Sequence, residues 1–489
     1  MPRTLQARDV LLRLDRSLSV PVSRQIEEQL RCAIQSGALV GGEQLPSTRV
    51  LAQDLGVSRG VILRVYNQLA AAGYICLRQG AAPRVRTGVH IEPQKADPSG
   101  CGPKVVHDLR PHLPEVASFP RQPWLRAVRE SLQQARTADL TYSNPAGLWE
   151  LRVAIANYLS RARGVRAQPE QVLITAGATH ALSLVSRVLA RRGKTRMAFE
   201  NPSHPVLRSA AAMGGQTVVA AAVDEWGVRP DTIDRADSLF VCPAHQFPTG
   251  VLLAPERRGA LIEWAREAEA LIVEDDYDAE FRYDRTPTEA LHALAPERII
   301  YVGSTGKTFA PALRLGWMVL PGDLVPEVRQ ELLGNMLQVS GLDQLAFANF
   351  LQRGDFDRHL RQMRGVYRTR RDLVASLLLR LLPEHELRGI AAGLHIVLGM
   401  PSRLAAVSVR TEAQALGTIV ESIDQHSFDD YQGPAALLLG YGALPEPTLE
   451  RAYTALARII RRRGLRMHPG HSDRTKRSTV GQSAASAAG

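Results

Sequence analysis

The sequence of 489 residues has little lysine, little cysteine and no long apolar run. Only five of its 60 basic residues are lysine, so arginine carries almost all of the positive charge. The four cysteines lie far apart without a CxxC pair or a metal-ligand spacing, which argues against a disulfide framework and favours a reducing compartment. No apolar run could span a bilayer, and the N-terminus lacks a signal-peptide core. We expect a soluble cytoplasmic protein with no membrane association and no metal site.

The positive charge that is present is unevenly distributed. The formal net charge is +11, and the first 90 residues hold twelve arginines against six acidic residues. Residues 461–477 are basic again, and we expect a disordered tail over 465–489 because its end is of low complexity. An excess of arginine in a compact segment favours an anionic partner, and nucleic acid is the first candidate.

A change of composition divides the chain. Residues 88–106 are rich in Pro, Gly, Asp and Ser without periodicity, which predicts a flexible linker between a small domain at 19–87 and a large one at 107–464. In the large region, short β-rich runs such as QVLITAG, SLFVCP, ALIVEDD and RIIYVGS alternate with helical segments. This alternation predicts an α/β fold with a doubly wound, mostly parallel sheet and ligands at the carboxyl ends of its strands.

The small region has the spacing of a helix-turn-helix. An apolar stripe over residues 22–34 predicts a first helix, and Ser47 or Thr48 can cap a second that ends at Gly56. Ser58 can cap the next helix after a turn of three or four residues. In this geometry the second helix of the motif enters the major groove of DNA by its N-terminal end.

Several arginines could serve that DNA contact. Arg59 and Arg64 lie on the predicted groove-binding helix, and two short strands around Gly80 would form a wing. The arginines of this wing that could reach phosphates are Arg78, Arg84 and Arg86. Any one of them could instead belong to a solvated face. The ordered pattern LPSTR, LGVSR and GY makes residues 19–87 resemble the GntR-type winged helix, which implies a double-stranded DNA operator and DNA contacts at Arg49, Ser58 and Arg59.

Lys307 is one of the five lysines and follows a glycine in YVGSTGKTFAPALRLGW, which looks like the end of a nucleotide-binding P-loop. The P-loop motif needs glycine where Tyr301 stands, and Pro311 falls in the first turns of the helix that the motif requires. A nucleotide site is therefore excluded. A lysine can instead form a Schiff base with pyridoxal 5′-phosphate, provided that other groups hold the pyridine nitrogen, the phosphate and the ring face.

Residues of these kinds stand near Lys307 or at the ends of predicted strands. Asp275 ends an apolar run and can hold the pyridine nitrogen, and Tyr277 lies two residues further on. Groups suited to the phosphate are Ser304, Arg314 and the backbone N–H groups of Ala178 and Thr179 in ITAGATHAL.

The motifs YSNPAG, ITAGATHAL, ENPSHP, CPAHQFPTG and VEDDYDAEFRY make residues 108–460 resemble fold-type I aminotransferases, which have a small C-terminal α+β subdomain. With the N-terminal head, the chain resembles the MocR/GabR group of transcription regulators. The resemblance implies that Lys307 forms the internal aldimine, that Asp275 binds the pyridine nitrogen and that Tyr277 binds the ring hydroxyl. It also places Ser304, Arg314, Ala178 and Thr179 at the phosphate, His204 over the ring, and Tyr142 at the neighbouring subunit's cofactor, which implies a homodimer.

Two positions bear on the ligand. Leu438 stands in an apolar run where the aminotransferases usually carry an arginine that binds the substrate carboxylate, and Arg208 could replace that arginine. His204 could alternatively be a loop histidine held by backbone.

We expect a pyridoxal-phosphate-dependent transcription regulator that senses an amine or amino acid through the Lys307 aldimine. The alternatives are an active, and then weak, aminotransferase with a DNA-binding head, and a regulator that senses pyridoxal phosphate itself.

Overall fold

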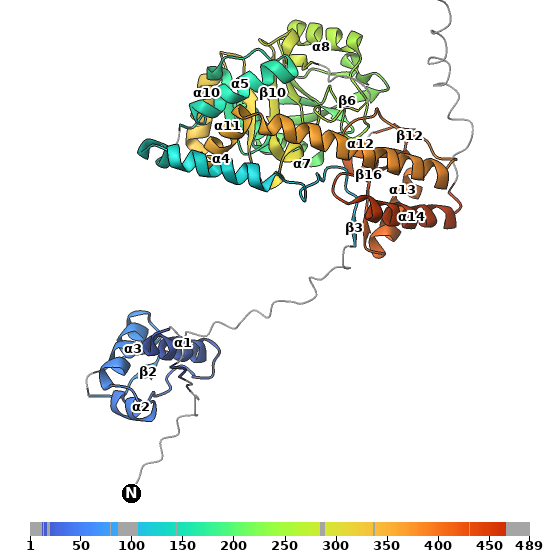
Figure 1. The fold of residues 1–489 in the computed structure, drawn as a ribbon. Coiled ribbons are helices and arrows are strands. Elements are labelled where there is room, and N and C mark those ends of the chain that lie inside the picture. Colours follow the sequence, from blue (N-terminus) through green and yellow to red (C-terminus); the bar gives the residue numbers. More distant parts are fainter. Residues whose placement is uncertain are drawn as a thin grey trace, which may run out of the picture. The chain divides into compact units, whose positions relative to one another are not determined.

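The computed structural model describes residues 12, 14–16, 20–78, 80–86, 106–142, 144–283, 289–335, 338–429 and 431–465. The chain divides into two units, residues 1–102 and 103–489 (Figure 1). Residues 88–105 of the predicted linker and 466–489 of the predicted tail lie outside the described residues. No helix in the described ranges is long and apolar enough to cross a membrane.

The first unit is a winged helix built on one apolar cluster. Its helices pack through Ile26, Leu30, Ile62, Val65 and Leu69, all of which are buried. Its elements are α1 (Val22–Gln35), α2 (Thr48–Asp54), α3 (Arg59–Ala71), β1 (Ile75–Cys76) and β2 (Arg84–Val85). The two strands pair antiparallel and form the wing.

The ends of the helices in this unit follow local capping rules. The Ser47 hydroxyl accepts a hydrogen bond from the Val50 N–H at 3.3 Å and caps α2, and Gly56 ends that helix with φ of +61°. Ser58 occupies the capping position of α3, but its side chain makes no capping bond. The Ser58 hydroxyl is therefore not held by the helix that it precedes.

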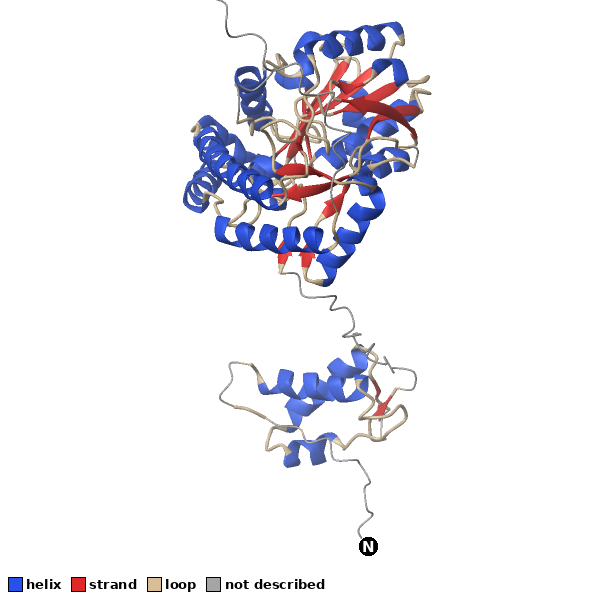
Figure 2. Ribbon diagram, turned by 90° about the vertical axis from the view of Figure 1, so that its right-hand side faces the viewer, coloured by secondary structure: helices blue, strands red, loops and turns tan. Residues whose placement is uncertain are grey.

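The second unit is built on an eight-stranded sheet in the order β4-β11-β10-β9-β8-β5-β6-β7. The neighbours β6, β5, β8, β9 and β10 run parallel, while β11 is antiparallel to both β10 and β4. Helices cover the sheet (Figure 2). The strands are β4 (Val172–Thr175), β5 (Arg196–Asn201), β6 (Thr217–Asp224), β7 (Gly227–Val228), β8 (Ser238–Val241), β9 (Leu271–Asp275), β10 (Ile299–Ser304) and β11 (Gly316–Val319).

The apolar runs that predicted strands lie in this sheet. Every residue of β8 and β9 is buried, as expected for parallel strands that are covered on both faces, and the edge strand β4 is buried as well. The predicted α/β class with a mostly parallel sheet is confirmed. The helices are α4 (Arg121–Gln134), α5 (Trp149–Arg163), α6 (Ala178–Arg191), α7 (Pro205–Met213), α8 (Pro255–Glu267), α9 (Thr305–Thr308), α10 (Val325–Asn335), α11 (Gly341–Gln352) and α12 (Asp355–Leu381).

A small α+β subdomain follows, with a four-stranded sheet in the order β12-β13-β16-β15. Helix α14 packs against α12, and the subdomain lies at one end of this unit (Figure 1). Strand β3, at the start of the unit, pairs with β14 and ties the chain entry to this end. Its elements are β3 (His107–Asp108), β12 (Leu387–Arg388), β13 (His395–Gly399), α13 (Arg403–Ala415), β14 (Thr418–Ile419), β15 (Glu421–Ser422), β16 (Ala436–Gly440) and α14 (Glu446–Arg462).

Candidate ligand pocket and DNA-binding face

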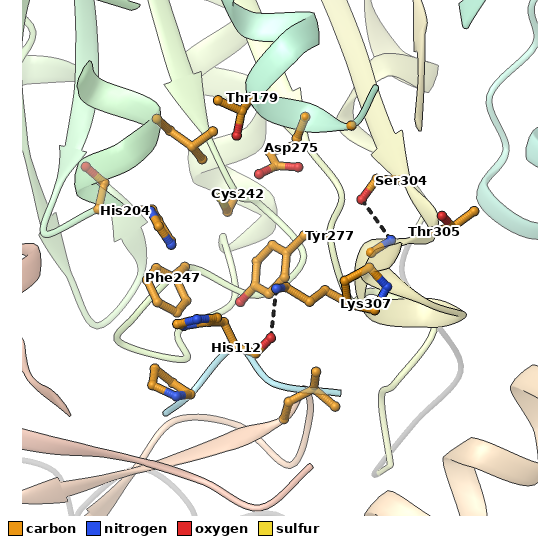
Figure 3. Close-up of a pocket in the computed structure, with 18 of the residues that line it drawn as sticks. His112, Thr179, His204, Cys242, Phe247, Asp275, Tyr277, Ser304, Thr305 and Lys307 are labelled. Atoms are coloured by element: carbon orange, nitrogen blue, oxygen red, sulfur yellow. Dashed lines mark hydrogen bonds between the residues drawn. The ribbon is translucent and has the colours of Figure 1, made fainter. Parts of the chain in front are cut away.

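A pocket of about 200 Å³ lies where β4, β8, β9 and β10 end (Figure 3). Eight of the nine residues predicted to bind a cofactor line it: Lys307, Asp275, Tyr277, Ser304, Arg314, Ala178, Thr179 and His204. The ninth, Tyr142, is not among the lining residues and is 92% exposed. The fold therefore brings together residues that are more than 100 positions apart in the chain.

The acidic run EDDYDAE, which begins in β9, distributes its carboxylates among separate partners. The backbone N–H groups of Leu291 and His292 donate to Glu274, each at 2.7 Å. Three further carboxylates also have partners: Arg163 and Tyr301 donate to Asp276, His245 is bonded to Asp278, and Tyr158 donates to Glu280. Four of the five acidic residues are thereby neutralised or hydrogen-bonded away from the pocket.

Asp275 is the exception. It is 6% exposed and lines the pocket, and no described residue forms a hydrogen bond with its carboxylate. Burial, together with the neighbouring Asp276 and Asp278, raises its pKa to about 7, and Lys307 opposes the rise. A buried carboxyl group without a partner is costly, so this site suits a ligand that offers an N–H or a positive charge.

Lys307 extends into the same pocket from the short helix α9. The Ser304 hydroxyl begins this helix by accepting from the Gly306 N–H at 3.4 Å. The Lys307 Nζ donates to the His112 carbonyl oxygen at 2.8 Å (Figure 3). Burial lowers the pKa of the amine, and Asp275 and Asp278 oppose that change. A lysine with a lowered pKa is more often neutral and therefore more nucleophilic.

The opposite end of the pocket suits an anion. Helix α6 begins there after Gly177, which has φ of +102°, and no side chain caps its first turn. The free N–H groups of Ala178 and Thr179 therefore face this end, with the positive end of the helix dipole. Arg314 lies beside Gly177 and donates to the Ala176 carbonyl oxygen at 2.7 Å.

Aromatic rings line a further side of the pocket. The His204 ring lies 5.5 Å from that of Phe247 and 6.0 Å from that of His112, measured between centroids. The His204 Nδ1 also accepts from the Val206 N–H at 3.3 Å, so this histidine both lines the pocket and caps α7. Burial, His426 and His112 lower the pKa of His204 to about 4, which leaves its ring neutral.

Several residues at or beside the pocket were not predicted from the sequence. His112 contributes a carbonyl oxygen, which every residue has, so no motif could indicate it. His245, Gln246 and Phe247 do lie within the quoted motif CPAHQFPTG, which offered a signal. The Gln246 amide donates to the carbonyl oxygens of Pro202 and Phe247 at 2.8 and 2.7 Å and so holds the loop that carries Phe247.

Neither of the two positions considered for a carboxylate-binding arginine lines the pocket. Leu438, in β16, packs in an apolar cluster with Val397, Ile423 and Tyr431. The Arg208 guanidinium lies 4.4 Å from the centroid of the Phe428 ring and is not among the lining residues. Arg314 is the one arginine that lines the pocket in the described part of the chain.

The predicted DNA-binding residues lie on the surface of the first unit. The exposed residues are Arg49, Ser58, Arg59, Arg64, Arg78 and Gly80. The Arg59 Nε donates to the Thr48 hydroxyl at 3.3 Å, which links the starts of α2 and α3. Arg84 differs because its guanidinium donates to the Gly42 carbonyl oxygen at 2.8 Å and so braces the wing.

Comparison with known proteins divides the chain in the same way. Residues 22–85 match the gntR family of bacterial regulatory proteins, and residues 117–399 match aminotransferase class I and II. The α-aminoadipate aminotransferase LysN from Thermus thermophilus, solved with N-(5′-phosphopyridoxyl)-L-leucine, is 25% identical with a TM-score of 0.65. The match covers 72% of this chain and 92% of that one.

Two relatives match along almost their whole length. The pyridoxine biosynthesis transcriptional regulator PdxR from Corynebacterium glutamicum is 33% identical, over 88% of this chain and 94% of that protein. The probable rhizopine catabolism regulatory protein MocR from Rhizobium meliloti is 30% identical, over 91% and 95%.

The fold and the matches define a DNA-binding transcription regulator with an aminotransferase-like domain. The chain belongs to the MocR-type family of helix-turn-helix transcription regulators.

Proposed function

We propose that this regulator binds pyridoxal 5′-phosphate in the pocket at Lys307 and that the occupant of the pocket controls operator binding. The observation that carries the proposal is the buried, partnerless carboxylate of Asp275 in one pocket with a lysine of lowered pKa. When bound, the cofactor supplies an aldehyde that reacts with primary amines and a ring that acts as an electron sink.

The residues present fit the groups of this cofactor. Asp275 would hold the pyridine nitrogen, and Tyr277 would hold the ring hydroxyl. The phosphate would bind to Ser304, Arg314 and the N–H groups of Ala178 and Thr179, and His204 would lie against the ring. Lys307 supplies the amine, which is held by the His112 carbonyl oxygen.

A reconstitution experiment tests the cofactor. The protein incubated with pyridoxal phosphate and then desalted should retain a visible absorbance band, and Lys307→Ala should lose it. Lys194→Ala is the matched control because the Lys194 amine donates to the Glu269 carbonyl oxygen on the surface. A wild-type protein that stays colourless, or a Lys307→Ala variant that keeps the band, would contradict the proposal.

The ligand that regulates DNA binding is, in this proposal, an amine or an amino acid that enters the loaded pocket. Its binding would shift the large unit between two states of different operator affinity, and the shift cannot exceed its difference in affinity for them. Amines are favoured over ordinary carboxylates because Leu438 is buried among apolar residues and offers no bidentate grip. Titration of the loaded protein with amines and amino acids, while operator affinity is measured, tests this choice.

The burial of Leu438 among apolar residues also supports a second candidate function, in which pyridoxal phosphate itself is the signal. Among the described residues, no arginine other than Arg314 lines the pocket, so none is left to bind the carboxylate of a further ligand. The name of the Corynebacterium relative, a regulator of pyridoxine biosynthesis, agrees with this alternative. If it is correct, pyridoxal phosphate alone changes the operator affinity of the cofactor-free protein, and added amines have no effect.

We also propose a homodimer. Tyr142 is fully accessible in the single chain, and large apolar residues nearby in sequence are exposed as well: Leu125, Leu132, Leu140 and Trp149 are each at least 49% exposed. Apolar exposure of this extent on one segment is typical of an interface. Analytical ultracentrifugation should give twice the chain mass, and a monomer at micromolar concentration would contradict the proposal.

A further inference from the structure

Two buried side chains and one partly buried side chain meet at a single nitrogen beside the pocket. The His245 Nδ1 lies 2.9 Å from the Asp278 Oδ2 and 3.0 Å from the Tyr277 hydroxyl. His245 and Asp278 are 3% and 2% exposed, so water does not compete for these contacts. Tyr277 is the member of the group that lines the pocket, where it lies beside Lys307 (Figure 3).

Asp278 decides the direction of these hydrogen bonds. An ionised carboxylate only accepts, so the His245 Nδ1 must carry a hydrogen to satisfy Asp278. A nitrogen that carries a hydrogen cannot accept from Tyr277, and its N–H can instead be shared with the Tyr277 oxygen. The Tyr277 hydroxyl proton then has no acceptor in this group and is free to donate into the pocket.

We infer that His245 and Asp278 are positioning residues that keep the Tyr277 hydroxyl a donor toward the ring oxygen of the bound cofactor. The inference rests on the proposed binding of pyridoxal phosphate. Nothing in the chemistry of Tyr277 alone sets this direction, because a phenol both donates and accepts.

The packing around the pair supports a fixed arrangement. A Cβ atom added at Gly393 would collide with the His245 Cε1 and the Asp278 Oδ2, so only glycine leaves room for the pair. On the other side, the His395 ring lies 5.4 Å from that of His245 and its Nε2 is bonded to the Pro248 carbonyl oxygen. The titratable groups that act on Tyr277 besides Asp278 are Cys242, Asp275 and Glu200, and Lys307 acts on Asp275.

The pH midpoint of the visible absorbance change in the loaded protein tests the inference. The Tyr277 hydroxyl would stabilise negative charge on the ring oxygen and so lower the proton affinity of the loaded site, and loss of this donor would raise the midpoint. Tyr277→Phe should raise it by about one unit, a tenfold change in proton affinity. Asp278→Asn removes the charge that fixes the His245 proton. This substitution should also raise the midpoint, by a smaller amount.

The sign of the shift separates this role from a simple charge effect. Removal of a nearby negative charge alone destabilises the protonated state and lowers the midpoint. Glu280→Gln, which keeps the hydrogen bond with Tyr158, is the matched control and should leave the midpoint unchanged or slightly lower. In the Tyr277→Phe background, Asp278→Asn should produce no further rise. A fall or no change with Asp278→Asn alone would overturn the inference.

A second measurement uses the unaltered chain and does not require the cofactor. Nitrogen-15 NMR of histidine-labelled protein should show His245 with its hydrogen on Nδ1. A hydrogen on Nε2 instead would overturn the inference even if every variant failed to load. A wild-type protein without a visible band would contradict the proposed function only, because this measurement still reports the direction of the hydrogen bonds.

Discussion

In the DNA-binding unit Arg49, Arg64 and Arg78 are exposed and form no ion pair with a described residue, whereas Arg163 and Arg370 of the large unit are buried against carboxylates. Arg163 contacts Asp276 at 2.6 Å, and both side chains are 1% exposed. A buried charge must be paired because its loss of hydration is costly, but an exposed one is free to meet a partner. The same residue type is therefore paired inside one unit and is available to a partner on the surface of the other.

The largest effect should follow from breaking the buried pair. Arg163→Leu leaves the Asp276 carboxylate buried without its partner and should lower the free energy of unfolding of the large unit by about 3–5 kcal/mol. Denaturation followed by tryptophan fluorescence measures it, because all five tryptophans lie in that unit. Arg266→Ala, which removes an exposed pair with Glu297 in the same unit, should change stability by less than about 0.5 kcal/mol. Equal effects of the two substitutions on the free energy of unfolding would contradict the contrast between buried and exposed arginines.

Asp275 is a third case, a buried charge without a partner. Its pKa is raised from 3.8 to about 7, so the folded state holds the proton more tightly than the unfolded state. The contribution of Asp275 to the free energy of unfolding is therefore fully present below pH 4, and it is lost as pH rises through 7. In the cofactor-free protein Asp275→Asn should raise the free energy of unfolding at pH 8 by about 3–4 kcal/mol and should have little effect at pH 4.

The control for this prediction is the loaded protein. Bound pyridoxal phosphate should remove the advantage of Asp275→Asn, since the ionised Asp275 then has a partner. A stability gain of equal size at pH 4 and pH 8 would show that burial of the charge is not the cause.

The smallest effect concerns the exposed arginines. Arg59→Ala should weaken binding to DNA from upstream of the regulated gene by about five- to tenfold and reduce the slope of affinity against salt by about one. Filter binding or fluorescence anisotropy at several salt concentrations measures both. Arg84→Ala should have less effect because the Arg84 guanidinium is bonded to the wing. If Arg59→Ala leaves the affinity for DNA unchanged, the start of α3 does not contact the DNA.

The success of sequence reasoning differs between these regions for a physical reason. The central strands are continuous apolar runs because both faces are buried. Ser304 caps the short helix that carries Lys307, so local patterns predict both residues. The contact between Lys307 and the His112 carbonyl oxygen joins residues 195 positions apart and uses no particular side chain. The shared nitrogen of His245 likewise depends on how two loops pack. Tyr142 was predicted from a role between subunits, which a single chain does not contain.

The most direct test of the central claim is the operator affinity of one preparation with an empty pocket, with pyridoxal phosphate, and with pyridoxal phosphate plus amines. If the pocket controls DNA binding, at least one addition changes the affinity of the wild-type protein, and the same addition leaves Lys307→Ala unchanged. Identical operator affinities in all three states of the wild-type protein would contradict it.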